Sequence, residues 1–313
     1  MFRLFAFLHI FATMINQLSI LIPVYNDVPE PLVAELHRQA EAIEGLEYEI
    51  LVFDDGSDNE DAIRRNMAVC ALPFCRYVRG GRHVCRAAMR NDMARHGRYD
   101  WHLMVDARLS IVYKDFIRRY LDSGARPGEA VCGGVCVDGG SDTKRLYREN
   151  LRFRYEKHEE KRHSFEARKM QPYSSFRTTN FFYHRTVLER VPYDERIKTY
   201  GYEDVMLGKA FKEAGIRVLH IDNPVAYMSF ESNTAYLKKL DQALLTLHRF
   251  APELQGFSPL LEIMSTLRRC RLLWLVRLFH VFFGKALHHS LEGRHPSLFL
   301  LRLYKLGFFA GLG

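Results

Sequence analysis

Short apolar segments alternate with longer segments of mixed polarity over the first third of the chain. The apolar segments are expected strands at residues 18–24, 48–53, 74–78 and 101–105. Between them, the spacing of apolar positions predicts helices at residues 29–43, 59–69 and 86–96. Strands that are apolar throughout and alternate with helices are typical of a parallel sheet covered on both faces. The pattern therefore predicts an α/β fold with a mostly parallel central sheet.

The second half of the chain is less regular. Its expected elements are strands at 130–137, 176–183 and 217–221, a solvated helix or lid at 144–169, a stretch at 199–214 whose later part is a helix, and a helix at 233–250. Pro252, Gly256 and Pro259 then mark a break. We therefore expect an apolar N-terminal segment over residues 1–17, one large domain over 18–250 and a tail over 251–313.

The first 17 residues are apolar, but the segment is shorter than a helix needs to span a bilayer. A signal peptide would end in a small-residue cleavage site, and none is obvious before the first strand. Met14 lies just before that strand and is an alternative start of translation. We expect an interfacial segment or a spurious extension.

Net charge is concentrated in the tail. The whole chain carries +8, and residues 260–313 contribute eight Lys/Arg against two acids, which is +6. Basic residues there interrupt bulky apolar ones, which predicts amphipathic helices in a membrane interface. The alternative is a helical hairpin packed on the large domain. We expect no nucleic-acid partner, because the charges lie among large aliphatic side chains.

Six cysteines are present, without a CxxC pair or metal-finger spacing. Most lie in apolar segments, which is typical of reduced thiols in a cytosolic protein.

Polar side chains follow three of the predicted parallel strands. They are Tyr25 and Asn26, then Asp54 and Asp55, and finally Asp106. Ligands of such sheets bind beyond the carboxyl ends of the strands. Neither GxGxxG after the first strand nor GxxxxGK[ST] occurs, which argues against a dinucleotide-dependent dehydrogenase and a P-loop enzyme. Arg86 and Arg90, early in the third helix, are placed to face a diphosphate.

Within the stretch 199–214, Gly201 and Tyr202 precede an acidic pair, Glu203 and Asp204, in the first turn of the predicted helix. One explanation is local, because negative charge stabilises a helix N-terminus. The other is chemical, because a carboxylate facing the sheet edge could deprotonate an attacking hydroxyl group.

Seven short motifs together resemble the family-2 glycosyltransferases of the GT-A fold, in the expected order over about residues 18–250. They are PVYND (23–27), VFDDGSD (52–58), RAAMRN (86–91), MVDAR (104–108), TTNFF (178–182), YGYED (200–204) and HIDNP (220–224). The resemblance implies a GT-A fold and an inverting transfer of sugar from a nucleotide-sugar donor, UDP- or GDP-linked, to an acceptor hydroxyl.

The resemblance also implies roles for single residues. Asp204 would be the catalytic base, supported by Glu203. The nucleotide would lie against Pro23, Tyr25, Asn26, Asp54, Asp55, Arg86 and Asp106, and the donor sugar along Asn180 and Gly201.

The chain departs from the family pattern where a divalent cation, Mg²⁺ or Mn²⁺, is expected. The family's DxD motif ends in a carboxylate, and this chain has Arg108 there; Asp106 remains as the one ligand. Tyr227 stands where a later histidine ligand is expected. Because hard cations need several oxygen ligands, metal dependence is doubtful. We expect the guanidinium of Arg108 to replace the cation at the diphosphate. A site that binds nucleotide weakly and turns over poorly is the alternative.

These observations predict a glycosyltransferase of surface polysaccharide or glycolipid synthesis, acting on a glycan or lipid-linked acceptor. Its expected location is the cytoplasm, at the inner face of the cytoplasmic membrane through a peripheral contact of the tail. A catalytically silent, nucleotide-binding partner subunit of a membrane-associated glycan-assembly complex is the main alternative, and a nucleotidyltransferase on a similar sheet is a third.

Overall fold

A computed structural model describes residues 15–313, so the expectations for the N-terminal segment and Met14 lie almost wholly outside the described residues. The strands are β1 Gln17–Val24, β2 Glu47–Asp54, β3 Cys75–Arg79, β4 Trp101–Val105, β5 Leu109–Ile111, β6 Ala130–Cys132, β7 Val135–Val137, β8 Asn180–His184, β9 Val218–His220 and β10 Val225–Tyr227. The helices are α1 Glu30–Glu41, α2 Glu60–Val69, α3 Arg86–His96, α4 Phe116–Leu121, α5 Thr143–Glu149, α6 Leu151–Glu159, α7 Phe165–Met170, α8 Thr186–Arg190, α9 Glu203–Glu213, α10 Asn233–Arg249, α11 Ala251–Leu254, α12 Pro259–Arg269, α13 Leu273–Glu292 and α14 Leu298–Gly311.

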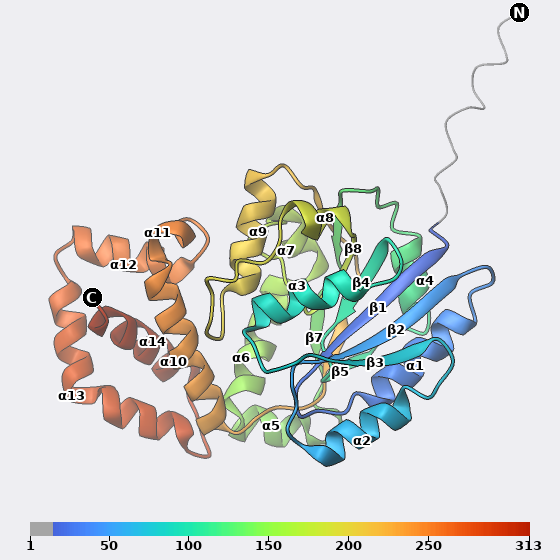
Figure 1. Ribbon diagram of the computed structural model, residues 1–313. Coiled ribbons are helices and arrows are strands. Elements are labelled where there is room, and N and C mark those ends of the chain that lie inside the picture. Colours follow the sequence, from blue (N-terminus) through green and yellow to red (C-terminus); the bar gives the residue numbers. More distant parts are fainter. Residues whose placement is uncertain (1–14) are drawn as a thin grey trace, which may run out of the picture.

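A seven-stranded sheet of order β3-β2-β1-β4-β8-β6-β9 forms the centre of the molecule (Figure 1). Strands β1 to β4 pair in parallel, β6 pairs in parallel with β9, and only β8 runs against its neighbours. The predicted α/β fold with a mostly parallel sheet is therefore confirmed. All six cysteines are free thiols.

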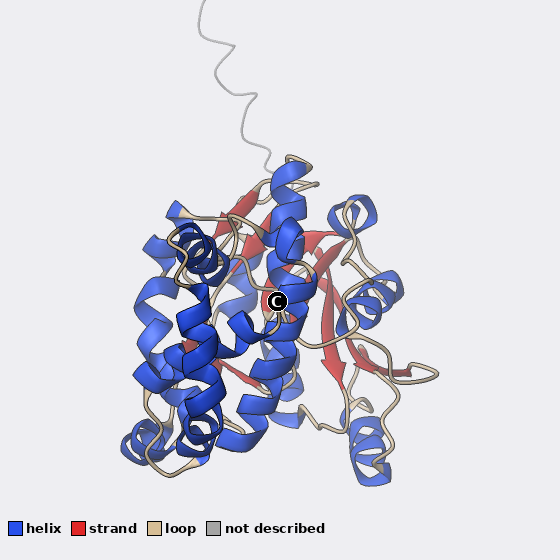
Figure 2. Cartoon of the chain, turned by 90° about the vertical axis from the view of Figure 1, so that its left-hand side faces the viewer, coloured by secondary structure: helices blue, strands red, loops and turns tan. Residues whose placement is uncertain are grey.

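Helices cover both faces of this sheet (Figure 2). Along β1, Ile20 and Ile22 point to one face and pack with residues of α1 and α4, whereas Leu21 points to the other and packs with residues of α3 and α9. The alternation follows from the two-residue period of a strand. Because both faces are buried, every position of β1 from Leu18 to Ile22 is fully buried, and all of them except Ser19 are apolar.

Residues 130–137 are not one strand, as the sequence analysis predicted. They form β6 in the central sheet and β7 in a second sheet of order β5-β10-β7. Gly133 and Gly134 separate them, and Gly134 has φ +89°, a conformation that side chains rarely adopt. A Cβ at Gly133 would collide with Tyr120 and Asn180. The apolar pattern could not show this break, because both halves are strands.

The charged residues 144–169 form helices α5, α6 and α7, joined by a short 3-10 segment at Glu160–His163. Leu151 and Phe153 of α6 are fully buried, and the Asn233 side chain accepts the Leu151 N–H at 2.7 Å. These contacts attach the segment to the start of α10.

The tail folds into a helical hairpin, α13 and α14, that packs on α10 and α6. Leu287 and Leu291 of α13 and Leu301 of α14 share a buried cluster with Leu237 of α10. The Tyr304 hydroxyl donates to Asp241 of α10 at 2.9 Å. The packed hairpin considered in the sequence analysis is therefore present. Among residues 15–313, no helix combines the length and apolar character needed to span a bilayer.

Candidate functional site

The carboxyl ends of β1, β2 and β4 lie at one edge of the sheet and point toward the C-terminal helices (Figure 1). Because β8 is antiparallel, its first residue, Asn180, pairs with Val105 at the end of β4. The Asp106 N–H donates to the Thr179 carbonyl at 3.1 Å. The TTNFF segment before and within β8 thus meets Asp106 at this edge.

Arg90 joins Asp106 to the acidic pair of α9. Its side chain is only 2% exposed, and Nη2 lies 3.0 Å from Oδ1 of Asp106. Nη1 lies 3.6 Å from Oδ1 of Asp204 and 3.7 Å from Oε1 of Glu203. Burial alone would lower the pKa of Arg90, but the carboxylates, Asp106 foremost, hold it above its ordinary value. Carboxylates more than 90 residues apart in sequence therefore share one buried cation.

Arg86 forms the outer part of the same cluster, and its side chain is 43% exposed. Nη1 lies 3.2 Å from Oε1 of Glu203, and Nη2 lies 3.9 Å from Oδ2 of Asp106. Its guanidinium also lies over the Tyr200 ring, 5.2 Å from the centroid. Arg86 therefore offers a guanidinium that solvent, and an anionic ligand, can reach.

The turn before α9 sets the direction of the two acids. Gly201 and Tyr202 both have positive φ, at +99° and +67°, and α9 starts at the next residue. Asp204 then accepts a hydrogen bond from the Thr178 hydroxyl at 2.5 Å and one from the Thr178 N–H at 3.3 Å. Its side chain remains 25% exposed, so an oxygen can be reached from solvent.

Asp54 and Asp55, at the end of β2, differ in their surroundings. Asp54 is fully buried, accepts the Ser57 N–H at 2.7 Å and also bonds the Tyr77 hydroxyl, so it supports the loop. Asp55 accepts the Val84 N–H at 3.1 Å and pairs with His83 Nδ1 at 2.8 Å. Burial raises the pKa of the Asp55 carboxyl above its ordinary value.

His83 also stacks on Tyr25, with ring centroids 4.2 Å apart and planes at 28°. Tyr25 follows β1 and is exposed. An aromatic face and a carboxylate beside it are the two features that hold a nucleobase, by stacking and by hydrogen bonding. In this structure both are engaged by one imidazole.

Three other residues predicted to line the donor site serve mainly to hold the fold. The Asn26 side chain bonds the backbone of Asp58 and Asn59 at 3.1 and 3.0 Å. Asn180 is buried, and its carboxamide bonds Tyr120, Gly134 and Asn223. Gly201 allows close approach to α10, because a Cβ there would lie 2.6 Å from that of Ala243.

Pro23 lies within β1, paired with Phe53, one residue before the strand ends. It therefore shapes the strand end that carries Tyr25.

Arg108, which the sequence analysis expected at the diphosphate, pairs with Asp27 in this structure. Its side chain is 64% exposed, and Nε pairs with Oδ2 of Asp27 at 2.5 Å. The guanidinium groups that lie against Asp106 belong to Arg86 and Arg90.

The residues present do not fit a divalent cation well. Asp106 already faces two guanidinium groups, and the Tyr227 ring lies under Arg152, 5.2 Å from its Cζ. Within residues 15–313, no three side chains of His, Cys, Asp or Glu are grouped as metal ligands would be. A fixed positive charge at this distance opposes a second cation.

Thr178 and His83 are the contacts that the sequence analysis missed. Thr178 belongs to the TTNFF motif, and its contact with Asp204 could have been anticipated from the resemblance. His83 gives no signal in the sequence, because its partners, Tyr25 and Asp55, precede it by many residues.

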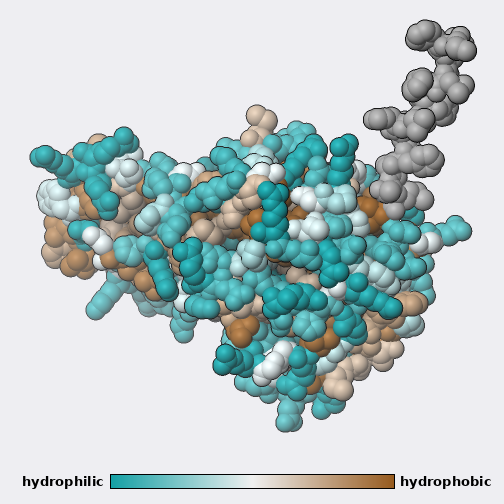
Figure 3. All heavy atoms as spheres, turned by 45° about the horizontal axis from the view of Figure 1, so that its top comes forward, coloured by the Kyte–Doolittle hydropathy of each residue, from teal (hydrophilic) through white to brown (hydrophobic). Residues whose placement is uncertain are grey.

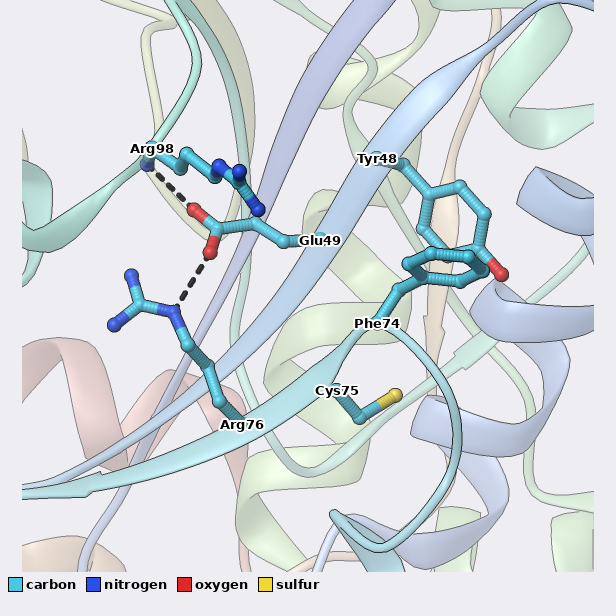
Figure 4. Close-up of a pocket in the computed structure, with 6 residues that line it drawn as sticks. All are labelled: Tyr48, Glu49, Phe74, Cys75, Arg76 and Arg98. Carbon is cyan, nitrogen blue, oxygen red and sulfur yellow. Dashed lines mark hydrogen bonds and ion pairs between the residues drawn. The ribbon is translucent and has the colours of Figure 1, made fainter.

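A hollow of about 400 Å³ lies elsewhere, between β2 and β3 (Figure 4). Glu49 and Tyr48 line it near the start of β2, so it lies toward the edge opposite Asp54 and Asp55. Glu49 is bonded there to Arg76 at 2.7 Å and to the Arg98 N–H at 2.5 Å. This hollow is separate from the acidic cluster.

Comparisons with known proteins bear on the same region. The family described as "Glycosyl transferase family 2" matches residues 19–191, more than half of the chain. A search of curated proteins finds no match. The chain is similar in structure to the mannosyltransferase PcManGT from Pyrobaculum calidifontis, solved with GDP-Man and Mn²⁺, with a TM-score of 0.55 and 14% identity over 94% of this chain and 84% of that one.

A second structural match is TarS from S. aureus, with a TM-score of 0.45 and 12% identity over 74% of this chain and 39% of that one. The likeness to PcManGT extends only to the fold, whereas the family match covers β1 to α8 and so includes Asp55, Arg90 and Asp106. The chain belongs to glycosyl transferase family 2 and has a GT-A fold.

Proposed function

We propose that the protein transfers a sugar from a nucleotide-sugar donor to an acceptor hydroxyl with inversion at the anomeric carbon. Membership of glycosyl transferase family 2 supports sugar transfer. The observation that carries the proposal is the meeting of Asp204, from α9, with Asp106, at the end of β4, on either side of Arg90. A base and a donor-side carboxylate then flank one site, as a direct displacement requires.

In the proposed step, Asp204 accepts the proton of the acceptor hydroxyl. The acceptor oxygen forms a bond to the anomeric carbon, and the bond from that carbon to the phosphate oxygen breaks on the opposite face. The nucleoside diphosphate leaves with the electron pair. The Thr178 hydroxyl and N–H hold the Asp204 carboxylate in one orientation, while its exposed part faces the acceptor.

The nucleotide is proposed to lie across the ends of β1 and β2. The base stacks on Tyr25 and donates to Asp55, so His83 has to move aside. Asp54 keeps the loop in shape, since its bonds to Ser57 and Tyr77 hold the turn that follows β2. UDP- and GDP-linked donors both offer a base N–H suited to a carboxylate.

We propose further that the leaving diphosphate is stabilised by protein cations. Arg86 is the candidate, because it is half-exposed and lies within 4 Å of both Asp106 and Glu203. Arg90 pairs with all three carboxylates and stays buried. Preorganised charge of this kind stabilises a leaving group without proton transfer. The role that the sequence analysis gave to Arg108 passes to Arg86.

The biological setting that fits best is the synthesis of a surface polysaccharide or glycolipid, with a glycan or lipid-linked acceptor, at the cytoplasmic side of a membrane. The support is the basic and apolar tail, which is packed beside α10 and therefore close to the α9 acids.

The test uses the full chain with a panel of UDP- and GDP-linked sugars. Thermal shift first finds the donor, because a bound ligand raises the melting temperature by mass action. Release of nucleoside diphosphate by that donor is then measured with water as the acceptor. We expect Asp204→Asn to slow release by about 100-fold or more. Asp92→Asn, an exposed acid on the same face of α3 as its partner Arg95, is the control and should match wild type. No binding and no release with any donor would contradict the proposal.

One observation favours the silent-subunit alternative. The oxygens of Asp55 and Asp106 are engaged by groups of the protein itself. If that arrangement persists with ligand, nucleotide binding without turnover is expected, and release would appear only after a second transferase is added.

A further inference from the structure

Helix α13 presents two different apolar faces. One is buried in the hairpin through Gly284, Leu287 and Leu291. The opposite face carries Trp274, Leu275, Leu278, Val281 and Phe282, all of them exposed. Spacings of three, four and seven residues place these five side chains on one side of the helix. We call them the outer face of α13.

The outer face is unusually apolar for a surface. Val281 is 77% exposed and Phe282 71% exposed. Phe283 and, on α14, Phe299 are exposed as well. Helix α13 lies at the outer end of the molecule, away from the central sheet (Figure 1), and hydrophobic atoms gather at that end (Figure 3). Contiguous exposed apolar surface of this kind marks a site of interaction.

Basic residues border the outer face at both ends. Arg268, Arg269 and Arg271 precede it, and Lys285 follows it, all exposed. Within residues 15–313, none of these four forms an ion pair. The two acids of residues 260–313 do not compensate, because Glu262 bonds Gln255 and Glu292 pairs with His288. An apolar centre with an unpaired basic border is therefore offered to solvent.

We propose that the outer face of α13 docks on the surface of an anionic phospholipid bilayer, with the helix in the interfacial plane. The apolar side chains enter the boundary between headgroups and acyl chains, and the basic border meets the anionic headgroups. Trp274 suits the headgroup level, because its ring has an apolar body and a polar N–H. The inference goes beyond the transfer reaction, and lipid binding is measured without any donor.

The basic border makes a second copy of the chain a poor partner for the outer face. A second copy meeting face to face would bring Arg268, Arg269 and Arg271 near their own counterparts, and like charges repel. A bilayer-spanning arrangement is not offered by any helix in the described part of the chain. An anionic surface matches both features of the outer face at once.

The experiment is flotation of the full chain with vesicles of phosphatidylcholine alone or mixed with phosphatidylglycerol. Wild type is expected to float with the anionic vesicles, less with the neutral ones, and less as salt is raised. Phe282→Glu should weaken binding by about tenfold or more, since it puts a charge at the centre of the apolar surface. Arg268→Gln with Arg269→Gln should lose about fivefold for each charge, and only on anionic vesicles.

Met170→Glu is the matched control. Met170 is a fully exposed methionine on α7, outside the tail, so its charge should leave flotation unchanged. All of these positions are exposed, and thermal unfolding checks that each variant is folded. Failure of wild type to float with anionic vesicles overturns the proposal, as does flotation that Phe282→Glu leaves intact.

Light scattering of the lipid-free protein tests whether the outer face instead binds a second copy of the chain. A monomer is expected. A wild-type dimer that Phe282→Glu converts to a monomer would assign the outer face to a second copy and overturn the membrane proposal.

Discussion

Arg90 is the residue on which the site depends. A buried guanidinium beside three carboxylates is stable only while the charges compensate one another, and removing one partner leaves others uncompensated. Glu203 is nearly as buried as Arg90, and its Oε2 has no hydrogen-bond partner within residues 15–313. Two guanidinium groups, of Arg86 and Arg90, face three carboxylates, so the charges of the cluster are coupled.

We predict that Arg90→Met lowers the free energy of unfolding by about 3 to 5 kcal/mol, because Glu203 and Asp106 lose their buried cation. Arg86→Met is the matched variant and should cost clearly less, since Arg86 is 43% exposed and water can replace it. Urea unfolding measures both. Equal losses in the two variants would contradict the central position given to Arg90.

His83 provides a second prediction at the residue scale. Its imidazole occupies Asp55 and the Tyr25 face, so a nucleobase has to displace it. His83→Ala is expected to tighten the binding of nucleoside diphosphate by about fivefold, the effect of about 1 kcal/mol of competing contact. Calorimetric titration with UDP and GDP gives the dissociation constants. His83→Phe keeps the stack on Tyr25 but not the ion pair with Asp55. Its dissociation constant should lie between those of wild type and His83→Ala. Weaker binding by His83→Ala would mean that the imidazole helps to hold the base.

At the scale of elements, local pattern was enough for the first half of the sheet. Residues 86–96 and 101–105 were predicted with the bounds that α3 and β4 have. Gly97 directly follows the helix, and the apolar run ends with the strand at Val105. The pattern failed at residues 130–137, where the apolar run continues through the change from one sheet to another. Pairing partners, and not local preference, decide such a break.

The packing of the elements also explains for which site residues the sequence could predict the neighbours. Asp106 and Arg90 lie on adjacent elements of the strand–helix alternation, so their proximity could be expected. Asn180 could not be placed, because its partners Tyr120 and Asn223 are distant in sequence and take all of its hydrogen bonds. That Asp204 lies near Asp106 could be predicted only from the resemblance to family-2 glycosyltransferases.

The turn into α9 carries the element-scale prediction. Gly201→Ala is expected to lower the free energy of unfolding by about 1 to 3 kcal/mol, because φ is +99° and the new Cβ would meet Ala243. Activity should fall with it, since the first turn of α9 holds Asp204. Gly215→Ala, at the other end of α9, also has positive φ but open space around it. Gly215→Ala should therefore lower the free energy of unfolding less than Gly201→Ala and leave turnover unchanged. A larger loss in Gly215→Ala than in Gly201→Ala would contradict this account of the turn.

At the scale of the whole molecule, two buried histidines, His102 and His220, and the half-buried His163 couple the fold to pH. Burial lowers the pKa of His102, His163 and His220 to about 4, from 6.5. Below pH 6.5 the unfolded chain takes up protons that the folded protein does not. Their contribution to stability is thus complete above pH 6.5 and is lost as pH falls toward 4.

We predict that the free energy of unfolding falls between pH 6.5 and 4.5, by up to about 1.4 kcal/mol per pH unit for each of these histidines. His102→Gln removes the contribution of one histidine. The free energy of unfolding, measured by urea titration at several pH values, should then fall less steeply with decreasing pH than in wild type. His295→Gln, at an exposed position, is the control and should keep the wild-type slope. An unchanged slope in His102→Gln would show that this histidine is charged in the folded protein.

The tail shows what composition can and cannot predict. Its charge and apolar residues predicted helices, and α13 and α14 form a helical hairpin. The sequence could not divide its apolar residues between the two faces, because Leu287 and Leu278 look alike until the packing on α10 is known. Membrane contact by the exposed apolar residues of the outer face stays a prediction.

The most direct test of the central claim, that the α9 acid and the arginine pair catalyse sugar transfer, is the initial rate of nucleoside diphosphate release. It is measured for wild type and Asp204→Asn, in EDTA and in excess Mn²⁺. We predict equal wild-type rates in the two conditions and loss of release in Asp204→Asn in both. Wild-type release that vanishes in EDTA and returns with Mn²⁺, or release that survives in Asp204→Asn, would contradict it.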